Sequence, residues 1–470
     1  MKTLNIALMR LLSLVIFGQI VFCSSLLASL PKNENVIKSK ASLVEVDEPY
    51  RLINDSPIYS SYPEWMWWVL QKSQGWVPSF EADEACKLSF SSPELDPKVC
   101  EARYSLNLWS RYLSKLYVRF DISDTHHFQR IMFEPQKGLK IRGLLAQQKN
   151  LKQGESRPLV ILRLGIHGNI DNFLAERFLA RILYQDLGYH VLILENLTSH
   201  GFLSLNDRVT FGGIEEGLHN FYIINLFSHH KISWSQQVSD IYLMGVSLGG
   251  QGVFVANYLD ENSIRLSASQ DVLEQSQPSI KAIQLFCPVV NLDLTMADLE
   301  NSGFFSAGAD IWNRDRFVAL KNKNPDLYND PDWWKIFFDL KPRFMTRVLS
   351  WINKTEPKPL MSLEIFKEQF PDVVLPQDFI NHVESSQSFI ELNKFWSFYK
   401  NNKTPILIYT TPDDPAVPTA LNTDLIREGK QKGEFNKVNF MNLKGLHCAL
   451  APEYQWPYLV EMIKRGFESR

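Results

Sequence analysis

The alternation of strand-like and helix-like segments constrains the fold of this chain more than any other feature. The strand-like runs from residue 158 onward are PLVILRLGI (158–166), YHVLILEN (189–196), DIYLMGV (240–246), IKAIQLFCP (280–288), TPILIYTTP (404–412) and NKVNFMNLKG (436–445). Helix-like segments cover 172–187, 215–229, 248–259 and 453–468. The first run is apolar apart from Arg163, as in strands buried on both faces of a parallel sheet. The pattern predicts an α/β fold with a mostly parallel, doubly wound sheet.

The predicted core is interrupted by one long insertion. Core strands and helices occupy 125–287 and 403–470, and the core opens with a hairpin that turns at 136–138. The intervening residues 288–402 are helical in pattern and rich in aromatic side chains. An insertion of this size has to bury apolar surface of its own, so we expect a helical cap over the strand ends. Residues 29–124 form an N-terminal extension with few periodic signals.

Residues 1–28 have the pattern of a secretory signal peptide. Lys2 and Arg10 supply positive charge, an apolar run extends from Leu11 to Phe22, and small residues follow. A membrane anchor is the alternative interpretation, although the apolar run is short for a membrane span. We therefore expect an exported protein, either periplasmic or secreted.

Charge and cysteine content narrow the range of partners and cofactors. The net charge of −3 offers no electrostatic basis for binding nucleic acid, and membrane contact is possible but not indicated. In an exported protein we expect a disulfide between Cys86 and Cys100, which lie close together in a loop-like stretch. No Cys-x-x-Cys pair or histidine cluster indicates a metal, so we expect neither a metal nor another cofactor.

The segment LMGVSLGGQG holds Ser247 between Gly245 and Gly249, where a predicted strand meets a predicted helix. This pattern is typical of a nucleophile elbow, a strained turn that exposes a serine hydroxyl at the edge of a sheet. Glycines two residues to either side remove side chains that would collide there. The alternative is a chance occurrence in which the glycines only permit a tight turn. The two interpretations differ because a nucleophile needs an acid and a histidine after later strands.

Both requirements are met downstream of Ser247. Asp413 and Asp414 follow the strand-like run ILIYTTP, and His447 follows VNFMNLKGL. A serine hydroxyl needs a base that accepts its proton and an acid that orients this base. The order serine, aspartate, histidine, each just beyond the carboxyl end of a strand, is that of the α/β-hydrolases. The sequence therefore predicts a catalytic triad of Ser247, His447 and one of the two aspartates.

At this point the chain resembles the α/β-hydrolase family over roughly residues 125–470. LGIHGNIDN resembles the His-Gly loop that helps to build the oxyanion hole of the family. ENLTSHGFLS resembles the Asp-x-x-Gly-His-Gly-x-Ser loop, although Glu195 replaces the acid and Ser199 the first glycine. DDPAVP resembles an Asp-Pro-x-Val-Pro segment in which the acid directly before proline is catalytic, and this favours Asp414 over Asp413.

The resemblance implies roles for five residues. Ser247 is the nucleophile, His447 the general base and Asp414 the orienting acid. The backbone N–H groups of Leu248 and Asn169 form the oxyanion hole. The implied fold is the α/β-hydrolase fold, with a mostly parallel, doubly wound sheet and a helical cap insertion.

Three further residues raise questions that the sequence leaves open. His167 is expected to shape its loop rather than to catalyse. Cys448 is expected to be structural, because its side chain should diverge from that of its neighbour His447. Arg163 falls in a buried strand and needs a partner, which the sequence does not identify.

The leading functional hypothesis is an exported serine hydrolase that acts on a carboxylic ester of a small molecule or lipid-like substrate. The aromatic insertion favours apolar acyl groups. A serine peptidase of the same fold is the first alternative, since a cap can also select the N-terminus of a peptide. A binding protein that keeps the fold without catalysis is the second. The acyl chain length, the leaving group and the oligomeric state are not readable from the sequence.

Overall fold

The computed structural model describes most of the predicted core within one compact unit, Asn35–Arg470. The described residues are 35–40, 43–46, 128–149, 151–166, 168–170, 176, 179–180, 182–206, 210, 212–266, 279–301, 359–394, 401–411, 414, 416–442, 447–449 and 456–468. The predictions for the N-terminal segment 1–28, for the Cys86–Cys100 disulfide and for His167 lie outside these residues.

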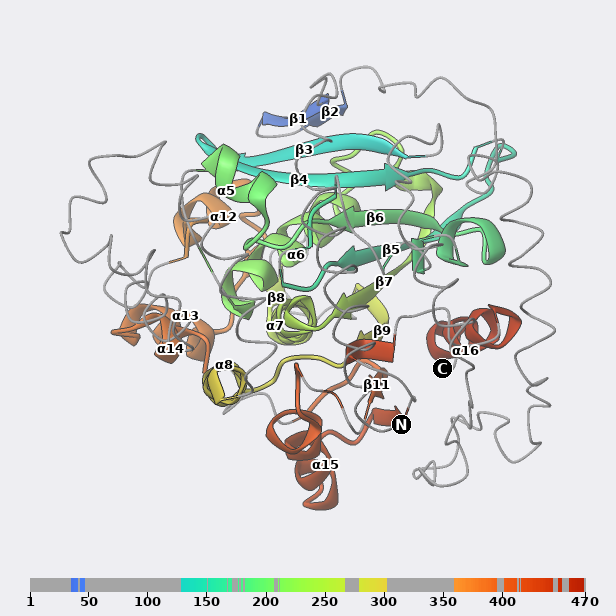
Figure 1. Ribbon diagram of the computed structural model, residues 1–470. Helices are drawn as coiled ribbons and strands as arrows, with labels where there is room; N and C mark the ends of the chain where they lie inside the picture. Colours follow the sequence, from blue (N-terminus) through green and yellow to red (C-terminus); the bar gives the residue numbers. More distant parts are fainter. Residues whose placement is uncertain are drawn as a thin grey trace, which may run out of the picture. The chain divides into compact units, whose positions relative to one another are not determined.

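A ten-stranded sheet organises this unit (Figure 1). Its strands, in spatial order, are β12 (Val438–Asn442), β11 (Ile406–Thr410), β9 (Ile280–Phe286), β7 (Val238–Val246), β5 (Arg157–Arg163), β6 (His190–Leu194), β4 (Leu139–Ala146), β3 (Gln129–Gln136), β1 (Asn35–Lys40) and β2 (Leu43–Val46). The strands from β12 to β6 run parallel to one another. β4 is antiparallel to both of its neighbours. The predicted mostly parallel, doubly wound sheet is therefore confirmed.

The order of the strands reverses direction at β5. The chain passes from β5 to β6 on one side and then returns to β7 on the other side, from where it continues outward through β9, β11 and β12. In open α/β sheets, the crevice outside the carboxyl ends of the strands at such a reversal is the usual ligand site. Ser247 follows β7 directly, at this position.

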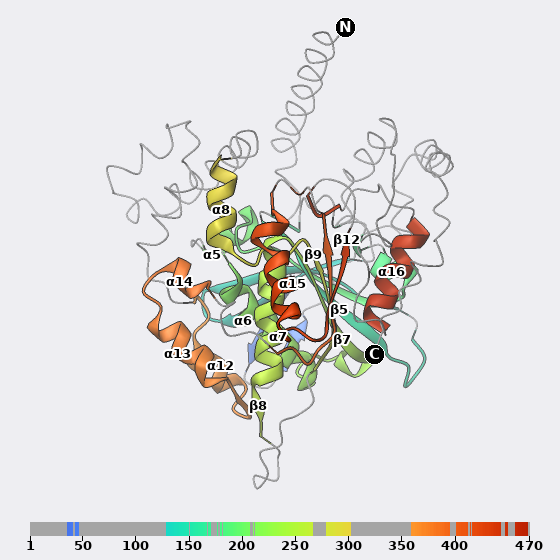
Figure 2. The same ribbon diagram turned by 90° about the horizontal axis from the view of Figure 1, so that it is seen from below.

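Helices cover both faces of the parallel strands. They are α6 (Gly213–Ser228), α7 (Leu248–Asn262), α15 (Thr423–Gln431) and α16 (Trp456–Glu468). Figure 2 shows α6 and α7 on one side of the central strands and α16 on the other. Along β5, Leu159 and Ile161 join the core cluster of α6 and α7, while Val160 and Leu162 join that of α16. Alternate residues point to opposite faces, so an apolar run fills both cores.

The helices described in the insertion are α8 (Leu292–Asn301), α12 (Leu363–Gln369), α13 (Gln377–Ser385) and α14 (Phe389–Leu392). They are helical as predicted for these stretches, and for the rest of 288–402 the helical character stays a prediction. α12 packs on α6 through Phe366, whose ring stacks on Phe221 at 5.3 Å. Glu215 of α6 accepts a 2.6 Å hydrogen bond from the amide of Leu360. The central residues 302–358, with most of the aromatic cluster, lie outside the described part, so a roof over Ser247 stays a prediction.

The local structure departs from the sequence prediction in several places, of which two concern predicted or missed helices of the core. The end of the predicted helix 172–187 is a π-helix, η2 (Ile182–Asp186), and Gly188 follows with φ of 69°. Helix α15 was not predicted, because the segment has few apolar residues and only Thr423, Ile426 and Gly429 of its nine are buried. Among the described residues, no helix is long and apolar enough to span a membrane.

Candidate active site

Ser247 occupies the turn between β7 and α7. Its backbone torsions are φ 52° and ψ −121°, a conformation that side-chain-bearing residues rarely adopt. Its amide donates to the carbonyl of Phe286 at 2.8 Å, and its own carbonyl accepts from the amide of Val289 at 3.1 Å. These bonds to the end of β9 and to the segment after it hold the strained turn in place. The turn has the features of a nucleophile elbow.

The two glycines of the motif are required by the close packing of this turn. A Cβ on Gly245 would lie 2.7 Å from the Cα of Gly250. A Cβ on Gly249 would lie 2.4 Å from the carbonyl oxygen of Leu164. Both contacts are to backbone atoms that cannot swing away. The glycines therefore do more than permit a bend. They let the turn that holds Ser247 pack against the start of α7 and the end of β5.

His447 connects the serine to the aspartate. Its Nε2 lies 3.1 Å from Oγ of Ser247, and its Nδ1 lies 2.9 and 2.8 Å from the two carboxylate oxygens of Asp414. A carboxylate at Nδ1 favours the tautomer with the proton on that nitrogen, which leaves Nε2 as the acceptor. The base is thus within proton-transfer distance of the hydroxyl. The structure brings the three predicted triad side chains together in the predicted order; Asp413 lies outside the described residues.

Asp414 is held as a carboxylate. Its Oδ1 accepts hydrogen bonds from the amides of Ala416 at 2.8 Å and Val417 at 2.9 Å. Burial alone would raise the pKa of Asp414, but the interactions with His447, Val417 and Ala416 outweigh burial and leave its pKa below the ordinary value. Asp414 therefore keeps its negative charge at neutral pH, where it can stabilise an imidazolium.

The predicted oxyanion-hole residues lie on two elements that meet at Ser247. Leu248 is the first residue of α7, where helical N–H groups lack partners within the helix and the dipole is positive. Asn169 lies in the loop after β5. This loop begins beside the nucleophile, since a Cβ on Gly165 would lie 3.2 Å from Cβ of Ser247. It is held by hydrogen bonds from Gly168 N–H to the Gly165 carbonyl and from Asn196 N–H to the Gly168 carbonyl, at 2.8 and 2.9 Å.

A buried ion pair supports this loop, and sequence analysis missed it. Arg142 of β4 donates to both oxygens of Glu195, at 2.9 and 2.7 Å, and also to Oδ1 of Asn169 at 3.2 Å. Ser199 donates to Oε2 of Glu195 at 3.0 Å. The sequence did indicate that a cation was needed, because Glu195, in the loop after a buried strand, needs a positive partner. Its position in a neighbouring strand was not readable from the sequence.

Arg163 finds the partners that its burial requires. Its Nε and Nη2 donate to Oδ1 of Asn220 at 3.1 and 2.6 Å, and its Nη1 donates to the carbonyl of Glu195 at 2.7 Å. Burial lowers the pKa of Arg163, although the charges of nearby carboxylates, Glu216 first among them, oppose this. The buried arginine thus ties β5 to α6 and to the loop after β6.

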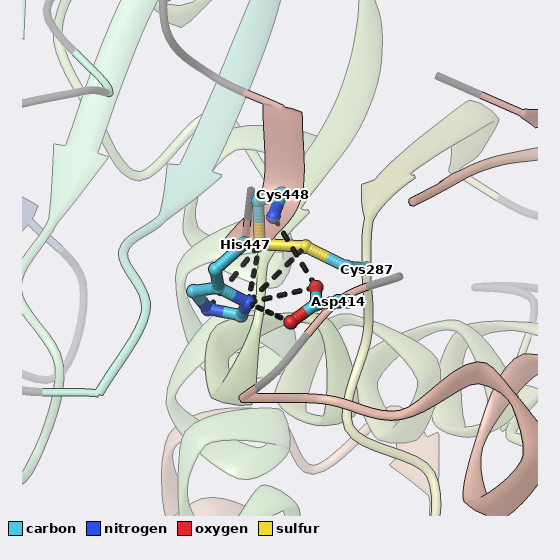
Figure 3. A group of neighbouring side chains, drawn as sticks. All are labelled: Cys287, Asp414, His447 and Cys448. Carbon is cyan, nitrogen blue, oxygen red and sulfur yellow. Dashed lines mark hydrogen bonds and ion pairs between the residues drawn. A yellow bond between two sulfur atoms is a disulfide. The ribbon is translucent and has the colours of Figure 1, made fainter. Parts of the chain in front are cut away.

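A disulfide joins Cys287 to Cys448, beside His447 (Figure 3). The prediction that the side chains of His447 and Cys448 diverge is wrong, because Sγ of Cys448 lies 3.6 Å from Nδ1 and 3.5 Å from Nε2 of His447. Cys448 has φ of 58° and ψ of 6°, and this left-handed turn folds its side chain back toward the ring. The two Cα atoms are 5.1 Å apart, within the usual disulfide range.

One group of side chains in the described part of the chain has the donors and the spacing of a metal site. The ligating atoms of Cys287, Asp414, His447 and Cys448 all lie within 4.8 Å of one another. Three of these four residues come from the triad or its immediate neighbour. No spacing in the sequence predicted this group, because Cys287 lies far from the other three along the chain.

The strand order, the elbow after β7, and the placement of Asp414 and His447 beyond β11 and β12 define an α/β-hydrolase fold, as the resemblance implied. No family model and no curated protein matches the chain.

Solved structures with a similar course of the chain include esterases and peptidases. A hyperthermophilic esterase from the archaeon Pyrobaculum calidifontis is 14% identical over 87% of this chain and 98% of its own, with a TM-score of 0.39. Est1E from Butyrivibrio proteoclasticus is 15% identical over 72% of this chain and 96% of its own, with a TM-score of 0.33. Acylaminoacyl peptidase from Pyrococcus horikoshii is 14% identical over 77% of this chain, with a TM-score of 0.35.

The chain spans 41 to 44% of the length of the acylaminoacyl peptidases that it matches. Because all of these similarities are distant, we base the fold on strand order and the function on the geometry around Ser247.

Proposed function

We propose that this chain is an exported serine hydrolase that cleaves carboxylic esters through an acyl-enzyme. The observation that carries the proposal is the continuous hydrogen-bond chain from Ser247 to His447 at 3.1 Å and on to Asp414 at 2.8 Å. The serine in this chain has a strained backbone. Strain of this kind persists where the surroundings enforce it, and it is concentrated at functional sites.

In the first half of the proposed reaction, Oγ of Ser247 attacks the acyl carbonyl of the ester. Nε2 of His447 takes the hydroxyl proton, and the charge of Asp414 stabilises the resulting imidazolium. The carbonyl oxygen becomes an oxyanion, which the amides of Leu248 and Asn169 are suited to bind. Each such donor is worth about 2.7–4 kcal/mol of transition-state stabilisation.

In the second half, the leaving alcohol takes the proton from His447 and departs, which leaves an acyl ester on Ser247. Water then enters, gives its proton to Nε2 of His447 and attacks the acyl carbonyl through a second oxyanion. Collapse of this oxyanion returns the proton to Ser247 and releases the acid. The side chain of Asp414 is fully buried, whereas that of His447 is 30% exposed, so water can reach the base but not the acid.

A serine peptidase of the same fold uses the same hydrogen-bond chain, so substrate choice separates the two enzymes. The insertion sequence has no acidic cluster that would bind the free amine of a peptide. Its aromatic content suits an apolar acyl group. The second alternative, a binding protein without catalysis, would gain nothing from a serine aligned with a base at 3.1 Å.

Labelling with a fluorophosphonate probe tests the nucleophile. We expect stoichiometric labelling of the wild-type chain at Ser247, no labelling of Ser247→Ala, and full labelling of the control Ser228→Ala, whose hydroxyl lies at the end of α6. Peptide mapping would identify the modified residue. Full labelling of Ser247→Ala, or none of the wild-type chain, would refute the proposed mechanism.

A panel of substrates tests the reaction class. We expect turnover of acyl esters, with little turnover of matched aminoacyl amides. Preference for the amides would replace the esterase proposal by the peptidase alternative. Export is tested by N-terminal sequencing of protein recovered from the periplasm or the medium, where we expect the N-terminal segment to be absent.

A further inference from the structure

The pair of cysteines next to the triad is placed to do more than stabilise the fold. Cys287 follows β9, which lies between the strand of Ser247 and the strand that leads to Asp414. Its amide donates to the carbonyl of Tyr409 in β11 at 2.7 Å. Cys448 directly follows His447, and its amide donates to Oδ2 of Asp414 at 3.3 Å. The disulfide therefore joins two segments: one is bonded to β11, which leads to Asp414, and the other follows His447 and is bonded to Asp414 itself (Figure 3).

The distances from Nδ1 of His447 to the two sulfurs are close to those around a tetrahedral zinc ion, whereas the sulfurs, bonded to each other in the disulfide, would have to separate to about 3.8 Å after reduction. Bonds of about 2.3 Å to sulfur and 2.0–2.1 Å to nitrogen place a sulfur and a nitrogen ligand about 3.6 Å apart. Nδ1 of His447 lies 3.9 Å from Sγ of Cys287 and 3.6 Å from Sγ of Cys448. A carboxylate oxygen of Asp414 lies 2.8 Å from the same nitrogen and would have to move outward by about 0.6 Å, because nitrogen and oxygen ligands of a tetrahedral zinc ion lie about 3.4 Å apart. Two sulfurs, one imidazole and one carboxylate are ligands that zinc accepts.

We propose that reduction of the Cys287–Cys448 disulfide creates a site for a thiophilic divalent cation such as Zn²⁺, with His447 and Asp414 as the other ligands, and that the bound cation switches the enzyme off. A dithiol reductant opens the bond: it becomes a disulfide itself, and each cysteine gains one electron and one proton. Zn²⁺ then displaces the two thiol protons. The inhibitory half of this inference rests on the proposed function, whereas the metal site does not.

Inhibition follows from the tautomer of His447. In the disulfide form, the proton of the neutral ring lies on Nδ1, facing Asp414, and Nε2 accepts from Ser247. A cation on Nδ1 takes the place of that proton, so the ring keeps its hydrogen on Nε2 instead. Nε2 then has no lone pair for the serine proton. Asp414 is drawn to the cation as well, and both partners of Ser247 are lost together.

The state of the sulfurs controls access to this site. As a disulfide, neither sulfur is a thiolate, and the thiolate is the form of cysteine that binds metals. As thiols, both would lie against a ring that is partly open to solvent, because the side chain of His447 is 30% exposed. The site would therefore exist only in a reducing environment and vanish on oxidation.

Zinc binding is measured on the full-length Ser247→Ala chain, so that the result does not depend on catalysis. We expect the chain treated with dithiol to bind one more equivalent of Zn²⁺ in equilibrium dialysis than the oxidised chain does. The additional equivalent should disappear in Cys287→Ser and in Cys448→Ser and persist in the matched control Cys86→Ser. With Co²⁺ in place of zinc, we expect thiolate-to-cobalt charge-transfer absorption only from reduced chains that carry both cysteines.

Activity is measured separately on the wild-type chain. We expect saturating Zn²⁺ to lower ester hydrolysis by the reduced chain by roughly 1,000-fold or more, as loss of a triad base does. The oxidised chain should keep its activity, and a chelator should restore that of the reduced chain. Equal zinc binding by reduced and oxidised chains would overturn the site. Binding of zinc to the reduced chain without inhibition would overturn the switch. Absence of hydrolysis in every state would contradict the proposed function and leave the binding result intact.

Discussion

Ser247 is supported on its two sides by different kinds of interaction. On the side of the base, the Cys287–Cys448 disulfide holds the loop of His447 against β9. On the side of the proposed oxyanion hole, the buried ion pair of Arg142 and Glu195 reaches the loop of Asn169. The disulfide is a covalent, apolar support, whereas the ion pair is a charged support that depends on its hydrogen bonds.

The difference shows how each support should fail. A disulfide acts mainly by restricting the unfolded chain, so its loss lowers stability without leaving an unsatisfied group behind. A buried ion pair gives little net stability, but removal of one partner leaves the other charge buried and uncompensated. The stability contributed near His447 should therefore be lost on reduction of the disulfide. The stability near Asn169 should be lost on substitution of Arg142 or Glu195. The following predictions separate these two responses.

The largest effect is expected from Asp414→Asn. An amide at this position holds His447 in the wrong tautomer, and the comparable change in a serine protease costs on the order of 10,000-fold in kcat. The adjacent change Asp413→Asn removes the same charge and is the matched control. Steady-state kinetics on one ester compare the two. A greater loss in Asp413→Asn would mean that the triad acid is Asp413.

Arg142→Met should lower the free energy of unfolding by about 3–5 kcal/mol, because the side chain of Glu195 is 0% exposed and would lose its cation. The double variant Arg142→Met/Glu195→Met should recover much of this loss, since it removes both charges. Urea denaturation measures both values. Equal stability of the single and double variants would show that the ion pair does not act as a unit.

Reduction of the wild-type chain in the presence of a chelator should lower the free energy of unfolding by about 2–5 kcal/mol, the usual contribution of a disulfide. In chains that also carry Cys86→Ser and Cys100→Ser, which removes the other predicted disulfide, the variant Cys287→Ala/Cys448→Ala should be insensitive to the same reductant. Urea denaturation with and without dithiol gives the comparison. A similar response of the variant would assign the effect to other cysteines.

An effect no larger than that of reduction is expected from pH acting on Glu216, near the ionic support. Burial raises the pKa of Glu216 to about 7, opposed by the charge of Arg163. The folded chain therefore holds a proton that the unfolded chain releases above the ordinary pKa of 4.5, and stability falls as the pH rises from about 4.5 to 7. This loss is on the order of 3 kcal/mol.

Glu216→Gln should flatten that part of the pH profile of stability, because the amide does not titrate. Glu368→Gln, an equivalent change at an exposed position of α12, is the control and should leave the profile as it is. Thermal unfolding at several pH values measures both. A profile that is unchanged in Glu216→Gln would place the titration elsewhere.

The sequence predicted what local patterns encode. Apolar runs marked the parallel strands, and the glycines around Ser247 marked the elbow, because each depends on residues close together in the chain. Proposals for Asp414 and His447 came from their position after later strands. What the sequence did not reveal depends on distant partners: Arg142 meets Glu195 across 53 residues, and Cys287 meets Cys448 across 161.

Backbone conformation explains the error at Cys448. The expectation that neighbouring side chains diverge holds for extended and right-handed backbone. The left-handed turn at φ of 58° brings Cys448 back onto the ring of His447, and no residue type in the segment GLHC announces that turn.

The long span of the disulfide also orders events during synthesis of the chain. A ribosome or translocon delivers Ser247 first, then Cys287, and Cys448 only 161 residues later. An oxidase that acts on the emerging chain cannot make this bond until the aspartate and the histidine have also emerged. The bond therefore cannot close before all three residues of the proposed triad have been synthesised, and a half-made chain carries Ser247 without His447.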